Sequence, residues 1–303
     1  MKLAAFLRFI RWKNLLLILY LQILLKFSLF PTFEITTNLS VFQFVTLLFS
    51  LILITAAGYI INDIFDLKSD LINKPQKVIV THYFSIESAQ HLYLIVNTLG
   101  IVLGIGLSLS IQKPSYSFIF MGASLLLYFY SKTLKSKPLI GNIAVSFLVA
   151  FSIITLCLFD LNSDIHSEDQ QLVIYVIMLL STFAFLINLV REVIKDIEDI
   201  NGDYNLKMST LPILFGVART KKTASFLCVF PLGLLLFIVA KYASIYKFTV
   251  LFLLLFALVP LLYVALKLLS AKTKKDFKKL SVFLKLIMFL GINSLLIFSL
   301  NSH

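Results

Sequence analysis

Two segments of the chain share one spacing of aspartates. Both place Asp at relative positions 0, 3 and 7, and the second copy follows the first at an offset of 133 residues. The six residues are Asp63, Asp66 and Asp70 in the first segment and Asp196, Asp199 and Asp203 in the second. On an α-helix these positions fall within an arc of about 60°, so each segment is predicted to align three carboxylates along one helix face. Because like charges at this spacing destabilise a helix, we expect cations to bind there.

Carboxylate oxygens are hard ligands that suit Mg²⁺, which commonly takes one or two carboxylates together with phosphate oxygens of a substrate. Metal ions and fixed cations also stabilise the negative charge that develops on a departing diphosphate. Fixed positive charge could come from lysines near the motifs, namely Lys74, Lys132, Lys135, Lys195 and Lys207. All six aspartates are therefore predicted Mg²⁺ ligands, and catalysis is predicted to depend on four of them, Asp63, Asp66, Asp196 and Asp199.

For a single motif of this kind, a helix face exposed to solvent would be as good an explanation as a metal site. Two motifs with identical spacing, each directly after an apolar segment, favour a metal site. In the second motif, Asn188 and Glu192 extend the stripe of polar residues back toward the apolar segment, whereas Glu198 points to the opposite face.

Arg191 is one of four arginines in the chain, and its planar guanidinium suits phosphate oxygens. It lies about 140° around the helix from Asp196, so the two need not bind the same group. It could bind the phosphate of a second substrate, pair with a neighbouring carboxylate, or anchor the helix end.

The elements that carry these residues are predicted to be membrane-spanning helices. Of 303 residues, 59% are hydrophobic and 14% are charged, compared with about 25% charged in soluble domains. Apolar runs of about 20 residues cross a bilayer as helices. The chain is predicted to form one membrane domain, residues 1–303, with nine spans at Asn14–Phe30, Val41–Ile61, Ala89–Ser110, Tyr116–Tyr130, Leu139–Phe159, Leu172–Val190, Ala224–Ala240, Phe248–Leu266 and Val282–Leu300.

The basic residues indicate the orientation of these spans. With the N-terminus in the cytoplasm, nearly all of the 27 lysines and arginines fall in cytoplasmic segments, as the positive-inside rule requires. The exceptions are Lys26, Lys113, Lys241 and Lys247. Both aspartate-rich loops are then cytoplasmic. The net charge of +12 therefore reflects membrane topology, and neither nucleic-acid binding nor a zinc site is expected.

At these motifs the sequence resembles the UbiA family of intramembrane prenyltransferases. The resemblance rests on three stretches: Asn62-Asp63-x-x-Asp66-x-x-x-Asp70 with Asn73-Lys74-Pro75; Tyr130-Ser131-Lys132-Thr133-Leu134-Lys135 with Pro138 and Gly141-Asn142; and Asp196-x-x-Asp199-x-x-x-Asp203 with Thr210-Leu211-Pro212 and Gly216. Gln76-Lys77-Val78 departs from the usual basic-Pro ending of the first stretch.

The resemblance implies an all-α bundle of nine transmembrane helices around a central cavity. It also implies Mg²⁺-dependent transfer of a prenyl group from a prenyl diphosphate to a lipophilic acceptor in the lipid bilayer. Asn62, Lys74, Tyr130, Lys132, Lys135, Asn188, Arg191, Lys195 and Lys207 are the expected substrate-binding residues.

The stretch Asn188–Asp199 is similar to family members that prenylate geranylgeranylglyceryl phosphate, an ether-lipid precursor. The alternative acceptor is an aromatic quinone precursor such as 4-hydroxybenzoate. A cation transporter is a more remote alternative, because the carboxylates cluster at inner helix ends and not at the middle of the bilayer.

Overall fold

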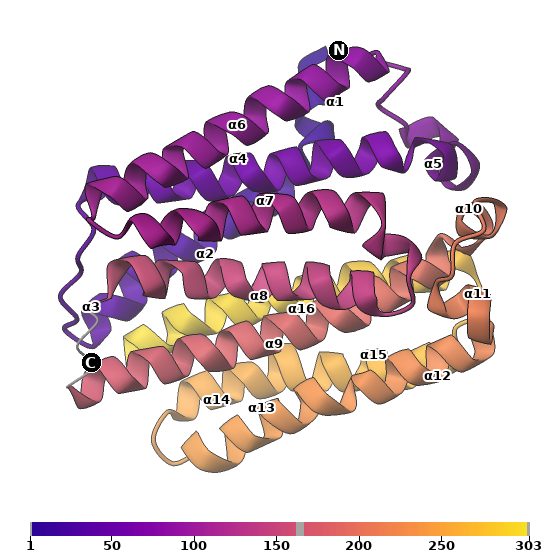
Figure 1. Cartoon of the computed structure of the whole chain (residues 1–303). Helices are drawn as coiled ribbons and strands as arrows, with labels where there is room; N and C mark the ends of the chain where they lie inside the picture. The colour runs from indigo at the N-terminus through magenta and orange to yellow at the C-terminus, as the bar shows by residue number, and fades with distance from the viewer. Residues whose placement is uncertain (1, 162–166, 302–303) are drawn as a thin grey trace. The chain divides into compact units, whose positions relative to one another are not determined.

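A computed structural model of the chain describes residues 2–161 and 167–301, and Figure 1 shows it coloured from the N-terminus to the C-terminus. Those residues are almost entirely helical and form no β-strand. Eight helical segments are long and apolar enough to cross a membrane within the described ranges. They are Trp12–Thr32, Val41–Phe65, Ile86–Ser110, Ile140–Asp160, Glu168–Glu198, Val217–Tyr242, Lys247–Ser270 and Lys274–Leu300. The chain is a multi-pass membrane protein with an all-α fold, as predicted.

The predicted count of nine spans is not confirmed. The expected span Tyr116–Tyr130 corresponds to α7 (Ser117–Lys132), which has 16 residues. A helix of that length rises about 24 Å, less than the hydrocarbon core of about 30 Å. A short 3₁₀ turn at Pro114–Tyr116 precedes it, since proline fixes the backbone where the helix would otherwise extend.

The chain forms two compact units. Unit 1 comprises the chain up to Tyr20, Asn38–Val145 and Asn201–Ser209. Its helices are α1 (Lys2–Phe9), most of α2 (Trp12–Leu24), α4 (Val41–Phe65), α5 (Leu67–Asn73), α6 (Ile86–Ser110), α7, the start of α8 (Ile140–Asp160) and most of α10 (Ile200–Asn205). Within this unit α4, α6 and α7 pack against one another (Figure 1).

Unit 2 comprises Leu21–Thr37, Ser146–Ile200 and the chain from Thr210 onward. Its helices are α3 (Phe30–Thr32), the rest of α8, α9 (Glu168–Glu198), α11 (Leu211–Phe215), α12 (Val217–Leu227), α13 (Val229–Tyr242), α14 (Lys247–Leu253), α15 (Val259–Ser270) and α16 (Lys274–Asn301). Two π-helical segments, Leu25–Leu29 and Leu254–Leu258, join consecutive helices, and α9 packs along α16. The single membrane domain of residues 1–303 and the central cavity that the resemblance implies both stay predictions.

Both aspartate motifs interrupt a helix at the same place. α4 ends at Phe65 with Asp66 as its C-cap, and α9 ends at Glu198 with Asp199 as its C-cap. The ψ angles of Asp66 and Asp199 are −4° and 9°, far from the helical value of about −42°. The prediction of one continuous helix face for each motif is therefore wrong. Aspartate favours such positions because its side chain competes with the helix for backbone hydrogen bonds.

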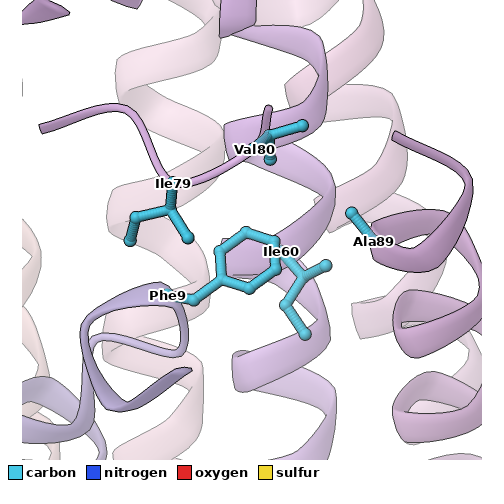
Figure 2. Packing of buried hydrophobic residues seen from close by; sticks show 5 residues of the cluster. All are labelled: Phe9, Ile60, Ile79, Val80 and Ala89. Carbon is cyan, nitrogen blue, oxygen red and sulfur yellow. The ribbon is translucent and has the colours of Figure 1, made fainter. Parts of the chain in front are cut away.

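Within unit 1, a hydrophobic cluster holds the N-terminal helix α1 against α4 and the segment that follows α5. Figure 2 shows its five buried residues, which are Phe9, Ile60, Ile79, Val80 and Ala89. Phe9 is fully buried and its ring stacks on Phe84 with centroids 5.5 Å apart. Because Ile60 lies one turn before Asp63, this packing holds the end of α1 next to the first motif.

Candidate functional site

Asp66 is the most enclosed carboxylate of the first motif, with 5% of its surface exposed. Asn62 Nδ2 donates a hydrogen bond to Asp66 Oδ2 at 2.7 Å, and Lys135 Nζ forms an ion pair with the same oxygen. A buried carboxylate needs such partners because burial strongly disfavours an unpaired charge. The structure thus brings three of the predicted site residues together, two from the end of α4 and one from the turn Leu134–Ser136.

Lys135 owes its position to the turn that carries it. It lies in the 3₁₀ turn Leu134–Ser136, and that turn packs against Gly141 so closely that a Cβ there would lie 2.8 Å from Lys135 Cα. Burial is the largest single effect and disfavours the charged form of Lys135, but the charge and hydrogen bond of Asp66 together with the effects of Tyr130 and Asp203 outweigh it. The pKa of Lys135 is therefore above its ordinary value, and the amine stays charged at neutral pH.

The sequence analysis did not identify Arg11, another of the four arginines, as a site residue. Arg11 Nη2 lies 2.9 Å from Asp63 Oδ1, and its guanidinium lies 4.7 Å from the centroid of the Tyr59 ring. Asn14 Nδ2 donates to the Tyr59 hydroxyl at 3.0 Å, which holds the ring in place. Arg11 has a φ of 50°, in the left-handed region, between α1 and α2. The scarcity of arginine in the chain was the one available signal.

Asp70 lies beyond the helix break, on α5. Burial raises its pKa to about 6, and the charge of Asp66 adds to this effect, while Lys74 and Lys135 oppose it. The three carboxylates of the first motif thus lie among three cations, with Arg11 beside Asp63 and with Lys74 and Lys135 acting on Asp70. The oxygen-only donor set of these carboxylates would fit Mg²⁺.

The last aspartate of the second motif lies in unit 1, close to α5. Gly202 N donates to Asn73 Oδ1 at 3.0 Å, and Ser69 Oγ donates to Asp203 Oδ1 at 3.4 Å. Asn73 Nδ2 in turn donates to Ser69 Oγ at 3.3 Å. Asp203 is buried, with 4% of its surface exposed. These contacts join the end of the second motif to the segment that follows the first.

The rest of the second motif lies in unit 2, at the end of α9. Arg191 Nη1 and Lys195 Nζ both contact Glu192 Oε1, at 2.9 and 2.6 Å. Of the roles considered for Arg191, the structure shows pairing with a neighbouring carboxylate. Asn188 Nδ2 donates to Ser146 Oγ at 3.1 Å. Asp196 lies one turn after Glu192, and Asp199 ends the helix.

The remaining predicted residues are less closely involved. Lys132 Nζ lies 5.4 Å from the centroid of the Tyr128 ring, and Lys207 ends the turn after α10 with a φ of 54°. Within residues 2–161 and 167–301, no group of three or more His, Cys, Asp or Glu side chains is arranged to hold a metal ion. In this structure Asp63 and Asp66 face Arg11 and Lys135. Since Mg²⁺ often takes only one or two carboxylates with substrate phosphates, the predicted ligands stay a prediction.

Residues 30–291 match the model of the UbiA prenyltransferase family. The chain belongs to this family. The prediction of an enzyme of the prenyltransferase class is thereby confirmed at the level of the family.

Curated relatives share one name. The chain is 31% identical over 249 residues to digeranylgeranylglyceryl phosphate synthase of Saccharolobus solfataricus, and the match covers 82% of each chain. It is 32% identical over 244 residues to the Ignicoccus hospitalis protein of that name, covering 80% of this chain and 77% of the other. The match to the Methanobrevibacter smithii protein, at 36% identity, spans about half of that relative, 54% of its length.

Solved structures agree in fold. One described as a digeranylgeranylglyceryl phosphate synthase in membranes has a TM-score of 0.65 at 25% identity and covers 99% of this chain and 98% of its own. A UbiA homologue from Archaeoglobus fulgidus bound to GPP and Mg²⁺ has a TM-score of 0.60 at 16% identity, covering 96% and 99%. The second likeness concerns the fold alone.

Proposed function

We propose that the protein transfers a prenyl group from a prenyl diphosphate to geranylgeranylglyceryl phosphate. The observation that supports a prenyl diphosphate as the donor is the buried Asp66. Asn62 and Lys135 hold this carboxylate, in the unit that also contains Asp203. Geranylgeranylglyceryl phosphate as the acceptor is supported by the relatives named digeranylgeranylglyceryl phosphate synthase, one of which matches over 82% of both chains.

In this reaction the bond between the prenyl C1 and a diphosphate oxygen breaks, and the acceptor hydroxyl oxygen bonds to C1 as it loses its proton. Mg²⁺ held by the motif aspartates, with Asp63 and Asp66 as the proposed ligands in unit 1, would neutralise the leaving diphosphate. Lys135 and Lys74 supply fixed positive charge close to Asp66 and Asp70. Asn62 fixes the orientation of the Asp66 carboxylate by donating to one of its oxygens.

A direct assay tests the proposal. Purified protein with Mg²⁺ is given labelled prenyl diphosphates of different lengths and a panel of acceptors, and lipid products are identified by mass. We expect the digeranylgeranylglyceryl phosphate ether and release of diphosphate. A product formed only from 4-hydroxybenzoate would assign the aromatic alternative, and no diphosphate release with any acceptor would refute prenyl transfer.

Arg191 offers a test of the acceptor. Arg191→Lys should keep the contact with Glu192 but lose the bidentate geometry that suits a phosphate. We expect the KM for geranylgeranylglyceryl phosphate to rise about tenfold while the KM for the prenyl diphosphate changes little. Arg219→Lys, on α12, is the matched control. An unchanged acceptor KM would leave Arg191 with the structural role of pairing with Glu192.

Arg11 should compete with Mg²⁺ for Asp63. Arg11→Gln removes the cation that lies 2.9 Å from Asp63 Oδ1, so the Mg²⁺ concentration for half-maximal activity should fall by about two- to fivefold. Arg8→Gln, on α1, should leave the Mg²⁺ requirement unchanged. A higher requirement in Arg11→Gln would show that Arg11 assists metal or diphosphate binding instead.

The proposed orientation places both aspartate motifs in the cytoplasm. Single cysteines at the exposed positions Gln76 and Asn201, with Cys157 and Cys228 replaced by Ala, should not react with an impermeant thiol reagent added to intact cells. Ser69, although close to the motif, is buried and unsuitable for labelling. Ser115→Cys, between α6 and α7, should react from outside. Rapid labelling at Gln76→Cys or Asn201→Cys would reverse the orientation.

A further inference from the structure

Unit 2 contains a cavity that the proposed reaction does not use. Its volume is about 140 Å³, and α9, α13, α14 and α16 line it, with Phe33 at one edge. Most lining side chains are aliphatic or aromatic, such as Val176, Leu235 and Leu295. A cavity of about 150 Å³ can hold one benzene molecule, so this apolar cavity suits a short segment of a hydrocarbon chain.

One end of the cavity is aromatic and carries a cation. Tyr175, Tyr242 and Tyr246 line that end, near the start of α9 and the turn between α13 and α14. Lys241 Nζ lies 5.1 Å from the centroid of the Tyr175 ring and 5.3 Å from that of Tyr242. Because Lys241 is itself exposed, its ammonium group is available to an anionic headgroup at the mouth.

The cavity also contains one polar atom that the protein does not satisfy. Thr249 Oγ1 is buried and has no hydrogen-bond partner in the part of the chain that the structure describes. A helical threonine ordinarily donates to the carbonyl four residues earlier, and leaving a buried hydroxyl unpaired is unfavourable. Thr249 lies just beyond Tyr246, so it could bond to an oxygen near the headgroup of a lipid whose chain enters there.

The position of the cavity along α9 separates it from the aspartates. Phe183, at the other end of the cavity, precedes Asp196 by 13 residues, and Tyr175 precedes it by 21. At 1.5 Å per residue these intervals are about 20 and 32 Å, and the second is about the thickness of the hydrocarbon core. The mouth therefore lies near the membrane surface opposite Asp196.

We propose that this cavity binds a segment of one hydrocarbon chain of an anionic membrane glycerolipid. The headgroup lies against Lys241, an ester or ether oxygen accepts a hydrogen bond from Thr249, and the chain runs toward Phe183 and Gly291. At the deep end the Phe183 ring packs against Gly291, since a Cβ there would lie 3.1 Å from Phe183 Cε1. The bound lipid would tie the turn between α13 and α14 to α9 and α16.

Photo-crosslinking in nanodiscs tests the proposal. The probe is phosphatidylglycerol with a diazirine in one chain, and labelled residues are mapped by mass spectrometry. We expect labelling of cavity residues, reduced at least about fivefold by Lys241→Glu through charge repulsion and by Val176→Phe through lost volume. Lys247→Glu, an exposed lysine near the same turn, should keep the labelling. Equal labelling in Lys241→Glu, or cavity labelling only by a diazirine prenyl diphosphate, would overturn the proposal.

Thr249→Val gives a second, independent measurement that does not depend on the probe. In detergent without added lipid, this variant should raise Tm, because it removes an unsatisfied hydroxyl at constant volume. In phosphatidylglycerol nanodiscs the gain should disappear, since the wild-type hydroxyl then has a partner. An equal gain in both environments would contradict contact between Thr249 and the lipid.

Discussion

Asp66→Asn should lower prenyl transfer by about 100-fold or more while leaving the protein in the membrane. The amide has nearly the shape of the carboxylate, so the hydrogen bond from Asn62 can persist. It has no negative charge, however, so it no longer balances Lys135 and it binds a divalent cation much more weakly than a carboxylate does. We expect comparable losses for Asp63→Asn, Asp196→Asn and Asp199→Asn, measured as the rate of product formation at saturating Mg²⁺.

Two controls make the Asp66 result specific. Glu198→Gln removes a carboxylate from the last residue of α9, next to Asp199, and should keep most activity. If it is as damaging as Asp199→Asn, position within the motif does not matter and the assignment fails. The double variant Asp66→Asn/Lys135→Gln removes both charges of the buried pair, so it should recover any loss of Tm but no activity.

Gly202→Ala should reduce activity about tenfold or more, although it adds only one methyl group. A Cβ at this position would lie 2.4 Å from both Asn73 Nδ2 and Ser69 Oγ and 2.8 Å from the Ser69 carbonyl oxygen. Because the backbone carbonyl cannot turn aside as a side chain can, α10 must move away from α5. Asp203 would then lose its contact with Ser69 and its position near Lys135.

Gly106→Ala is the matched control, since Gly106 is also helical and a Cβ there meets nothing within 4 Å. It should leave activity unchanged and raise Tm slightly, as alanine favours the helix over glycine. The decisive measurement is kcat for each variant after gel filtration has shown a monodisperse protein. Wild-type kcat in Gly202→Ala would mean that docking of α10 on α5 is not needed for catalysis.

The lysines show how far residue type alone could lead. Lys74 and Lys135 were expected near the aspartates, and both act on Asp70. Lys132, which is equally close in sequence and equally basic, lies near the Tyr128 ring instead. The two neighbours differ because Lys132 ends α7 whereas Lys135 lies on the 3₁₀ turn packed against Gly141. Sequence spacing indicates which residues are close, and the turn decides where each side chain points.

The sequence by itself determined the membrane fold, the carboxylate motifs and the family. Runs such as Val41–Ile61 are read directly, because a bilayer of fixed thickness demands about 20 apolar residues in a helix that bonds its own backbone. The two aspartate motifs are likewise local in sequence. The apolar runs and the aspartate motifs depend only on residue type and spacing within one segment. They can therefore be recognised without knowledge of distant contacts.

Only the tertiary structure decided which distant residues complete the site. Arg11 reaches Asp63 because Phe9 packs on Ile60 in a cluster drawn from several segments, and Asp203 joins α5 because Gly202 has no side chain to keep the two apart. These outcomes follow from close packing between segments remote in sequence, where the space left by one side chain fixes the position of another.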